Sequence, residues 1–515
     1  MVMKNINTCF LNNFNATPMK RILVMVMALM MAGTAVSQVD QDSYEQMKNA
    51  MRQRYNQQKN QMHKQYDESR RKAEAEYAAF RKKANEEYVE AVRRAWQQMG
   101  VEPALPKPKE PAPPRPPKPQ VDKLPTTVPL PQDDVVPVAP KLPPAPVPPI
   151  PEPSEELPLL QFAVYGTPCS VHADATDLHF RLASADEKSV AAAWQQLSGE
   201  KYDGLLHDCL ARRDELSLSD WGYLRLLGSM SEKMLGSGSN EAVLLQMYLF
   251  VQSGYKARLA RQNGRLVMLV PFSHKIYSYS YVTLDGEAYY VLSTVKQGGV
   301  EVCQVGFPKE QVADIAVGKL PNLEGNPQPH RTFAAQRFGT MKAEVAVNKS
   351  LIDFMNDYPL SDAWDCYARA GLSEGVKAGL YPVLKAQIEG KSQKKAATML
   401  LDFVQSAFDY ATDQDQFGYE RPLFGDESFY YPKNDCEDRS ILYSILVRDL
   451  LGLDVVLVHW PGHLATAVAF PDEVEGDYYT VDGRRFTICD PTYIGADVGM
   501  TMPQFQDVSA KLLKL

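Results

Sequence analysis

A cysteine, a histidine and an aspartate follow one another near the end of the chain, each in a setting suited to thiol catalysis. They are Cys436, His463 and Asp490. A cysteine thiolate is a nucleophile, an imidazole can remove the thiol proton, and a carboxylate can hold the imidazole in the correct tautomer. The three residues therefore predict a nucleophile, a general base and an orienting group.

The segment around Cys436 predicts the start of a helix. Asn434 or Asp435 can serve as its N-cap, and Gly452 ends an apolar pattern with helical spacing. A cysteine in an exposed first turn meets unpaired N–H groups and the positive end of the helix dipole, and both favour the thiolate. Three acidic neighbours oppose this effect: Asp435, Glu437 and Asp438. The nucleophile therefore needs a base.

The base and the orienting group each belong to a predicted strand. Residues 453–460 form a β-branched run, Pro461-Gly462 is a turn signal, and His463 opens the next apolar run. A third strand begins at Arg485 and ends in Asp490. An imidazole just after a turn can face a cleft without being sealed in the core.

These residues resemble a known family. A Cys-x-Asp start, an apolar helix with Leu-x-x-x-Leu-x-Arg and a Leu-Gly-Leu stop, a His-led strand and an Asp-ended strand resemble the transglutaminase-like fold of papain-type cysteine enzymes. The resemblance runs from Pro359 to the C-terminus. It implies a catalytic triad of Cys436, His463 and Asp490. Many members carry an aromatic residue two positions after the histidine, where this chain has Leu464-Ala465, so the contacts on the substrate side are in doubt.

Simpler explanations exist for each residue taken singly. A lone cysteine is usually a small buried hydrophobe, and Asp-Pro is an ordinary turn. A member of this fold can also bind without turnover. His459 and His463 are four residues apart and suggest a metal site, but zinc needs further ligands in suitable geometry. The conjunction favours the triad, and we expect no cofactor and no metal.

The N-terminus predicts export. Residues 1–37 read as a signal peptide, with Met19 as an alternative start, a basic stretch, an apolar core and small residues before Gln38. The apolar run is too short to span a bilayer, so we expect a periplasmic or secreted protein with no transmembrane anchor after processing. The six cysteines that follow show no disulfide framework. A formal net charge of -8 argues against a nucleic-acid partner.

Two segments of unusual composition follow the signal. Residues 38–100 predict one long coiled-coil helix, because Tyr and Met recur with an eleven-residue period that suggests self-association into a homo-oligomer. A lone charged helix is the alternative. Residues 101–158 are rich in proline and predict an extended linker.

Residues 159–345, the middle region, predict an accessory α+β domain. Residues 241–258 read as a helix, a glycine and a strand, the order that follows Cys436. Asn240 stands where the cysteine would be, and His274 lies further on. We interpret this region as a degenerate transglutaminase-like repeat, and an unrelated accessory domain is the alternative.

Residues 346–515, the C-terminal region, complete an α+β protein as the catalytic domain. The expected function is an exported thiol enzyme that acts on peptide or carboxamide bonds of a peptide or protein substrate, for which a cell-envelope component is a candidate. Hydrolysis is favoured over crosslinking because nothing marks an amine-binding site or a calcium loop. The alternatives are a protein-crosslinking transglutaminase and a non-catalytic envelope scaffold.

Overall fold

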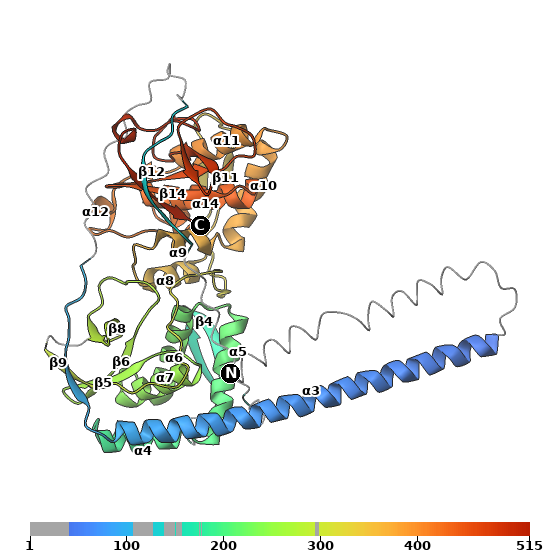
Figure 1. The fold of residues 1–515 in the computed structure, drawn as a ribbon, viewed down its shortest axis with the longest axis vertical. Helices are drawn as coiled ribbons and strands as arrows, with labels where there is room; N and C mark the ends of the chain where they lie inside the picture. The colour runs from blue at the N-terminus through green and yellow to red at the C-terminus, as the bar shows by residue number, and fades with distance from the viewer. Residues whose placement is uncertain are drawn as a thin grey trace. The chain divides into compact units, whose positions relative to one another are not determined.

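The computed structural model describes residues 41–106, 127–138, 150, 157–174, 176, 178–293 and 298–515. The predicted signal peptide, residues 1–37, lies outside them. The chain forms two compact units, Met1–Ala75 and Glu76–Leu515. The second unit is mixed α+β, as the sequence predicts (Figure 1).

The long helix α3 spans Gln41–Val92. The predicted helix over residues 38–100 is therefore too long at its C-terminal end, because the chain leaves the helix after Val92 and forms strand β1 (Gln97–Gly100). β1 pairs antiparallel with β9 (Gly299–Cys303). Ladder hydrogen bonds to a distant strand outweigh the local helix propensity of these residues.

The Tyr and Met seam of α3 changes character along the helix. In the first unit Met51, Tyr55 and Met62 are 54%, 65% and 68% exposed. In the second unit Tyr88 is buried, and its ring centroid lies 4.3 Å from that of Trp194 and 4.7 Å from that of Phe307. The later part of the seam thus packs within the chain, while self-association of the earlier part stays a prediction.

The second unit holds the remaining helices and strands. The middle region contains β3 (Leu159–Val164), β4 (Thr167–His172), α4 (Glu187–Leu197), α5 (Asp203–Glu215), α6 (Asp220–Leu235), α7 (Asn240–Gln252), β5 (Arg258–Gln262), β6 (Arg265–Val270), β7 (Tyr281–Leu284), β8 (Glu287–Val291), β9, β10 (Arg331–Ala334) and β11 (Lys342–Val345). The C-terminal region contains α8 (Lys349–Asp357), α9 (Trp364–Ala370), α10 (Glu374–Ile388), α11 (Gln393–Ser406), β12 (Asp409–Tyr410), α12 (Asp413–Gln416), α13 (Glu427–Tyr430), β13 (Lys433–Asn434), α14 (Cys436–Leu451), β14 (Val455–Trp460), β15 (His463–Val468), β16 (Tyr478–Val481), β17 (Arg484–Cys489) and β18 (Ala510–Lys514).

Two six-stranded sheets have the same strand order. The sheet of the middle region runs β7-β8-β6-β5-β9-β1. That of the C-terminal region runs β16-β17-β15-β14-β18-β2, where β2 spans Gln132–Val136. A helix precedes the central hairpin in both, α7 before β5 and α14 before β14. The middle and C-terminal regions therefore share the order of five strands, while the sixth strand pairs antiparallel in one sheet (β1) and parallel in the other (β2). Their origin by duplication stays a prediction.

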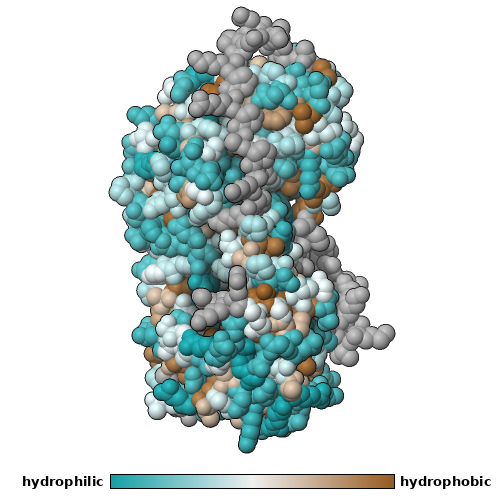
Figure 2. Space-filling model, turned by 90° about the vertical axis from the view of Figure 1, so that its left-hand side faces the viewer, coloured by the Kyte–Doolittle hydropathy of each residue, from teal (hydrophilic) through white to brown (hydrophobic). Residues whose placement is uncertain are grey.

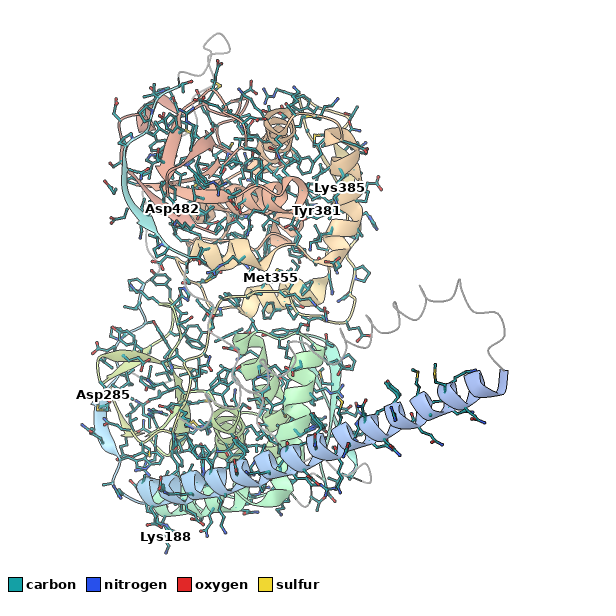
Figure 3. The ribbon with its side chains drawn as sticks, turned by 45° about the vertical axis from the view of Figure 1, so that its right-hand side comes forward. Lys188, Asp285, Met355, Tyr381, Lys385 and Asp482 are labelled. Carbon is teal, nitrogen blue, oxygen red and sulfur yellow. The ribbon has the colours of Figure 1, made fainter. Side chains whose placement is uncertain are left out.

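Matching hairpins in the two sheets close with the same turn sequence. Asp285-Gly286 joins β7 to β8, and Asp482-Gly483 joins β16 to β17. All four residues have positive φ, between 50° and 82°. Two-residue type I′ turns need positive φ at both central positions, which Asp-Gly tolerates well. Asp285 and Asp482 are labelled in Figure 3.

Part of the predicted linker belongs to the C-terminal sheet. Strand β2 (Gln132–Val136) pairs parallel with β18. Just before β2, the Leu130 N–H donates to the carbonyl oxygen of Tyr478 at 2.8 Å, and the Tyr478 N–H donates to the carbonyl oxygen of Val128 at 3.1 Å. Residues 128–136 thus contact β18 and β16, which would be the two edge strands of the sheet without β2. The prediction of a spacer over all of residues 101–158 is wrong here, because two open sheet edges offer this segment hydrogen bonds that proline-rich composition does not reveal.

Apolar side chains are largely turned inward. The face drawn in Figure 2 is mainly hydrophilic, with hydrophobic residues in small separate patches. Leu130, from the segment that bridges the C-terminal sheet, is buried with Trp460 and Phe505 in one apolar cluster. None of the helices in the described ranges combines the length and apolar character needed to cross a membrane.

Candidate functional site

Helix α14 places Cys436 at its first position. The Asp435 side chain accepts the Asp438 N–H, and Asp438 reciprocates in a capping box. At the other end Gly452 has φ of 65° in the left-handed region. The predicted helix start, N-cap and stop are confirmed. The sequence predicts an exposed first turn, but Cys436 is buried, with only 4% of the residue exposed.

The Cys436 thiol contacts one acidic side chain and one backbone amide. Sγ lies 3.1 Å from Glu437 Oε2, to which the thiol donates. Sγ also accepts the backbone N–H of Leu464. Leu464 directly follows His463 at the start of β15. The thiol therefore lies beside the backbone that carries the predicted base.

The surroundings of Cys436 keep the thiol protonated. Burial raises its pKa well above the usual range, and the negative charges of Glu437 and Asp435 raise it further. The Leu464 N–H opposes them by stabilising the thiolate. Burial and the acidic neighbours that the sequence identifies as unfavourable thus outweigh the effect of the Leu464 N–H on the pKa of Cys436.

Further carboxylates crowd the same place. Asp413, Asp435 and Asp438 are buried, and an oxygen of each lies within 4.8 Å of the others. Burial raises the pKa of Asp413, and the charges of Asp438 and Glu437 raise it further. Like charges this close cannot all ionise. The described residues that offer metal-ligand atoms around Cys436 are Asp413, Glu420, Asp435, Cys436, Glu437 and Asp438.

His463 and Asp490 are in contact. His463 Nε2 lies 2.9 Å from Asp490 Oδ2, and both side chains are 1% exposed. Asp490 Oδ1 accepts the N–H of Thr492 at 2.8 Å and of Tyr493 at 3.2 Å. The carboxylate therefore assigns the ring proton to Nε2 and leaves the lone pair on Nδ1. Nδ1 has no hydrogen-bond partner in the part of the chain that the structure describes.

Aromatic stacking fixes the plane of the imidazole. The His463 ring lies 5.8 Å from the Trp460 ring and 5.1 Å from the Phe505 ring, each at an interplanar angle of 6°. Trp460 is the cross-strand partner of His463 between β14 and β15. The ring can therefore present Nδ1 in only a narrow range of directions.

The structure brings two of the three predicted residues into direct contact. His463 and Asp490 form a hydrogen-bonded pair, whereas no hydrogen bond between Cys436 Sγ and the His463 ring occurs among the described residues. For proton transfer to His463, the Cys436 thiol would have to break its hydrogen bond to Glu437 and donate to Nδ1 of His463 instead. The possible metal-ligand groups in the described ranges do not combine His459 with His463.

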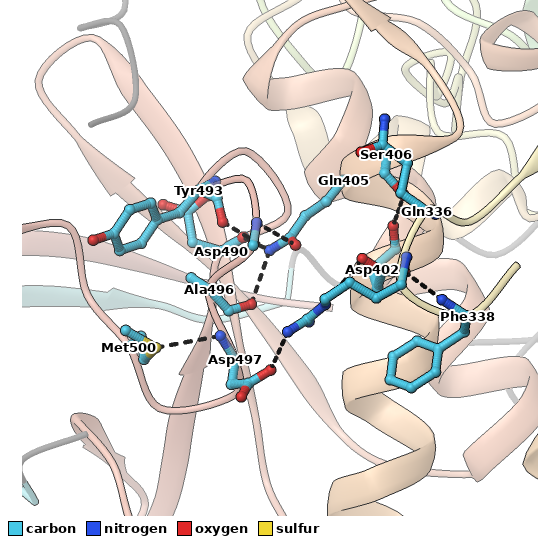
Figure 4. Close-up of polar contacts among 12 residues, drawn as sticks. Gln336, Phe338, Asp402, Gln405, Ser406, Asp490, Tyr493, Ala496, Asp497 and Met500 are labelled. Atoms are coloured by element: carbon cyan, nitrogen blue, oxygen red, sulfur yellow. Dashed lines mark hydrogen bonds and ion pairs between the residues drawn. The ribbon is translucent and has the colours of Figure 1, made fainter. Parts of the chain in front are cut away.

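Gln405, on α11, positions the orienting aspartate and is not identified by the sequence analysis. Its amide nitrogen donates to the carbonyl oxygens of Asp490, Tyr493 and Ala496 at 3.1, 2.9 and 3.2 Å (Figure 4). Its amide oxygen accepts the Gly495 N–H at 3.0 Å. One buried side chain thus holds the whole loop after β17. Asp402 and Ser406 lie on the same part of the helix, so local composition does not single out Gln405.

Arg439 joins α14 to the same support. Its guanidinium donates to the carbonyl oxygen of Gln405 at 3.1 Å and of Phe408 at 2.8 Å. Arg439 is 1% exposed and lies one turn after Cys436. The helix of the thiol and the loop of the aspartate are therefore anchored to one end of α11.

The middle region has different residues at the matching positions. Asn240 is the first residue of α7, and Arg265 is the first residue of β6. Asn240 Oδ1 accepts the Leu266 N–H at 2.9 Å, the same kind of contact that Cys436 makes with Leu464. By strand order Arg265 stands at the position of His463, and His274 lies beyond the end of β6 at Val270. At these two positions the middle region has neither a cysteine nor a histidine.

Comparisons with known proteins give no family for this chain. No family model, no curated protein and no solved structure matches it.

The acidic environment of Cys436 gives a prediction about pH. Glu437→Gln removes one negative charge beside the thiol and preserves side-chain size, so the pKa of Cys436 should fall. Alkylation by iodoacetamide follows the thiolate fraction, and its rate at Cys436 should therefore rise at lower pH than in the wild type. The measurement is the pH profile of Cys436 labelling by mass spectrometry.

Glu473→Gln, at an exposed residue paired with Arg485, is the matched control for this change of charge. Glu473→Gln should leave the pH profile of Cys436 labelling unchanged. A profile in Glu437→Gln that coincides with the wild type contradicts the assigned role of Glu437.

Proposed function

We propose that this protein is a thiol-dependent hydrolase of peptide or carboxamide bonds with a transglutaminase-like catalytic fold. The observation that carries the proposal is the hydrogen bond of 2.9 Å between His463 Nε2 and Asp490 Oδ2, with Cys436 Sγ on the N–H of the residue after His463. These contacts support roles for Cys436 as nucleophile, His463 as base and Asp490 as orienting group.

The proposed reaction starts with transfer of the Cys436 thiol proton to His463 Nδ1. The thiolate attacks the substrate carbonyl carbon and forms a carbon–sulfur bond, while the carbonyl oxygen takes up the negative charge. The backbone N–H of Cys436 is the candidate donor to that oxygen. As the carbon–nitrogen bond breaks, the imidazolium of His463 protonates the leaving amine, and a thioester remains.

Water then completes the cycle. His463 removes a proton from the water, the hydroxyl attacks the thioester carbon, and the Cys436 thiol is regenerated as the acid product leaves. Asp490 stabilises the imidazolium in both halves of the reaction. An amine in place of water would give a crosslinked product through the same thioester.

In this account Glu437 keeps the enzyme in a resting state. The thiol donates to Glu437 at 3.1 Å, and burial together with nearby acidic charges raises the pKa of Cys436. Substrate entry that displaces the Glu437 side chain would free the thiol for His463. Binding energy then contributes to formation of the nucleophile.

Burial of the thiol favours a second candidate function, a non-catalytic envelope scaffold. Cys436 is 4% exposed and is packed with Leu457, Leu464 and Leu513. In that case the His463–Asp490 pair is a structural element that holds the loop after β17. The two candidates differ in whether the protein turns over a substrate at all.

The test is a set of variants assayed on a substrate found by profiling a peptide library. Cys436→Ala should lower kcat by at least about 1,000-fold, and His463→Ala should be almost as damaging, because residues that act as a unit are lost together. Asp490→Asn should be milder, since it keeps a polar orienting group. Cys303→Ala, at another buried free thiol, is the control and should keep wild-type kcat.

Thermal unfolding within a few degrees of the wild type is required of each variant, so that lost activity is not lost fold. Full activity in Cys436→Ala contradicts the thiol mechanism, whereas a folded wild-type chain that cleaves no peptide of the library supports the scaffold.

We also propose that the protein is exported and self-associates through the first part of α3. The signal-like sequence of residues 1–37 supports export, and the exposed seam of Met51, Tyr55 and Met62 supports the contact.

Two charges on this seam should weaken self-association. Sedimentation of the full chain should show an oligomer that Tyr55→Glu with Met62→Glu converts toward monomer, because charges are costly in an apolar interface. Gln53→Glu with Gln57→Glu adds the same charge on the opposite helix face and is the control. A wild-type monomer at high micromolar concentration contradicts the proposal.

A further inference from the structure

A second thiol lies beside a histidine, away from Cys436. Cys366 Sγ, on α9, is 4.0 Å from His274 Nε2, a residue 92 positions earlier in the chain. Asp365 completes a group whose three ligand atoms all lie within 4.8 Å of one another. Thiolate, imidazole and carboxylate are the ligand types that zinc takes in proteins.

The hydrogen bonds of His274 determine its tautomer. Ser273 Oγ donates its single proton to Asp314 Oδ1 at 2.7 Å. The 2.8 Å contact between Ser273 Oγ and His274 Nδ1 must therefore use a proton on Nδ1. Nε2 then carries a lone pair, and this is the atom that faces Cys366.

We propose that Cys366, His274 and Asp365 form a binding site for one zinc-type divalent metal ion. Zinc bonds of about 2.3 Å to sulfur and about 2.0 Å to nitrogen place two tetrahedral ligands roughly 3.5 Å apart. The observed separation of 4.0 Å needs only a small closure. Three protein ligands leave a fourth position for water or for a ligand group.

Ser273 and Asp314 provide the support that histidine ligands of metals usually have. A metal-bound histidine donates its other ring N–H to an acceptor that fixes its orientation. Here Nδ1 donates to Ser273 Oγ, and Asp314 orients that hydroxyl in turn. Asp314 Oδ1 also accepts the Ala316 N–H at 2.9 Å, so this relay is fixed to the backbone.

The segments that supply the ligands are joined without a metal. The Tyr277 N–H donates to the carbonyl oxygen of Leu360 at 2.9 Å. Ser361 Oγ donates to the carbonyl oxygen of Lys275, also at 2.9 Å. The site is therefore largely preformed, and a metal would pin the loop after β6 to α9.

Arg369 lies next to the proposed ligands, since it forms an ion pair with Asp365.

The test uses the full chain, freed of metal with a chelator and titrated with Co²⁺ and with Zn²⁺. We expect one tightly bound equivalent and a sulfur-to-cobalt charge-transfer band, which Zn²⁺ removes by displacement. Cys366→Ala should abolish the band. His274→Ala should weaken binding by more than about 100-fold, and Ser273→Ala should weaken it by roughly 10- to 100-fold.

Two cysteine variants serve as controls. Cys303→Ala and Cys436→Ala should both retain the band and the stoichiometry. Loss of the band in Cys436→Ala with its retention in Cys366→Ala moves the metal to the acidic residues around α14 and overturns the proposal. If the folded wild-type chain takes up no metal, the proposal is also overturned, and Cys366 and His274 form only a thiol–imidazole contact.

Discussion

The contact between the first turn of α14 and the start of β15 determines what this site can do. Both backbone groups of Leu464 form hydrogen bonds with that turn. Its N–H donates to Cys436 Sγ, and its carbonyl oxygen accepts a hydrogen bond from Ser440 Oγ at 2.9 Å. Because His463 precedes Leu464, this one contact sets the thiol beside the backbone that carries the imidazole. Gln405 and Arg439 then tie the Asp490 loop and the same helix to α11.

The middle region keeps this contact without its chemistry. Asn240 replaces the thiol and accepts the Leu266 N–H, and Arg265 stands where the histidine would be. The backbone contact between helix and strand is therefore compatible with either residue type. The contact is therefore a feature of the fold. In the proposed enzyme, catalysis depends on which side chains surround the contact.

Local signals account for what the sequence predicts well. The cap at Asp435, the glycine stop at Gly452 and the His463 strand are all set by neighbours in sequence. What the sequence misses depends on distant partners. Examples are the end of α3 at Val92, the insertion of Leu130 into the C-terminal sheet, the burial of Cys436 and the support from Gln405. Each of these is decided by segments far away along the chain, which local periodicity cannot identify.

The central claim is that Cys436 forms a covalent bond to the substrate acyl group. Rapid acid quench of the full chain during turnover of a confirmed peptide substrate, followed by peptide mapping with mass spectrometry, tests it most directly. The account predicts an acyl adduct on the peptide that contains Cys436, removed by hydroxylamine as a thioester should be. An adduct on another residue, or turnover with no adduct on Cys436 at any quench time, would contradict it.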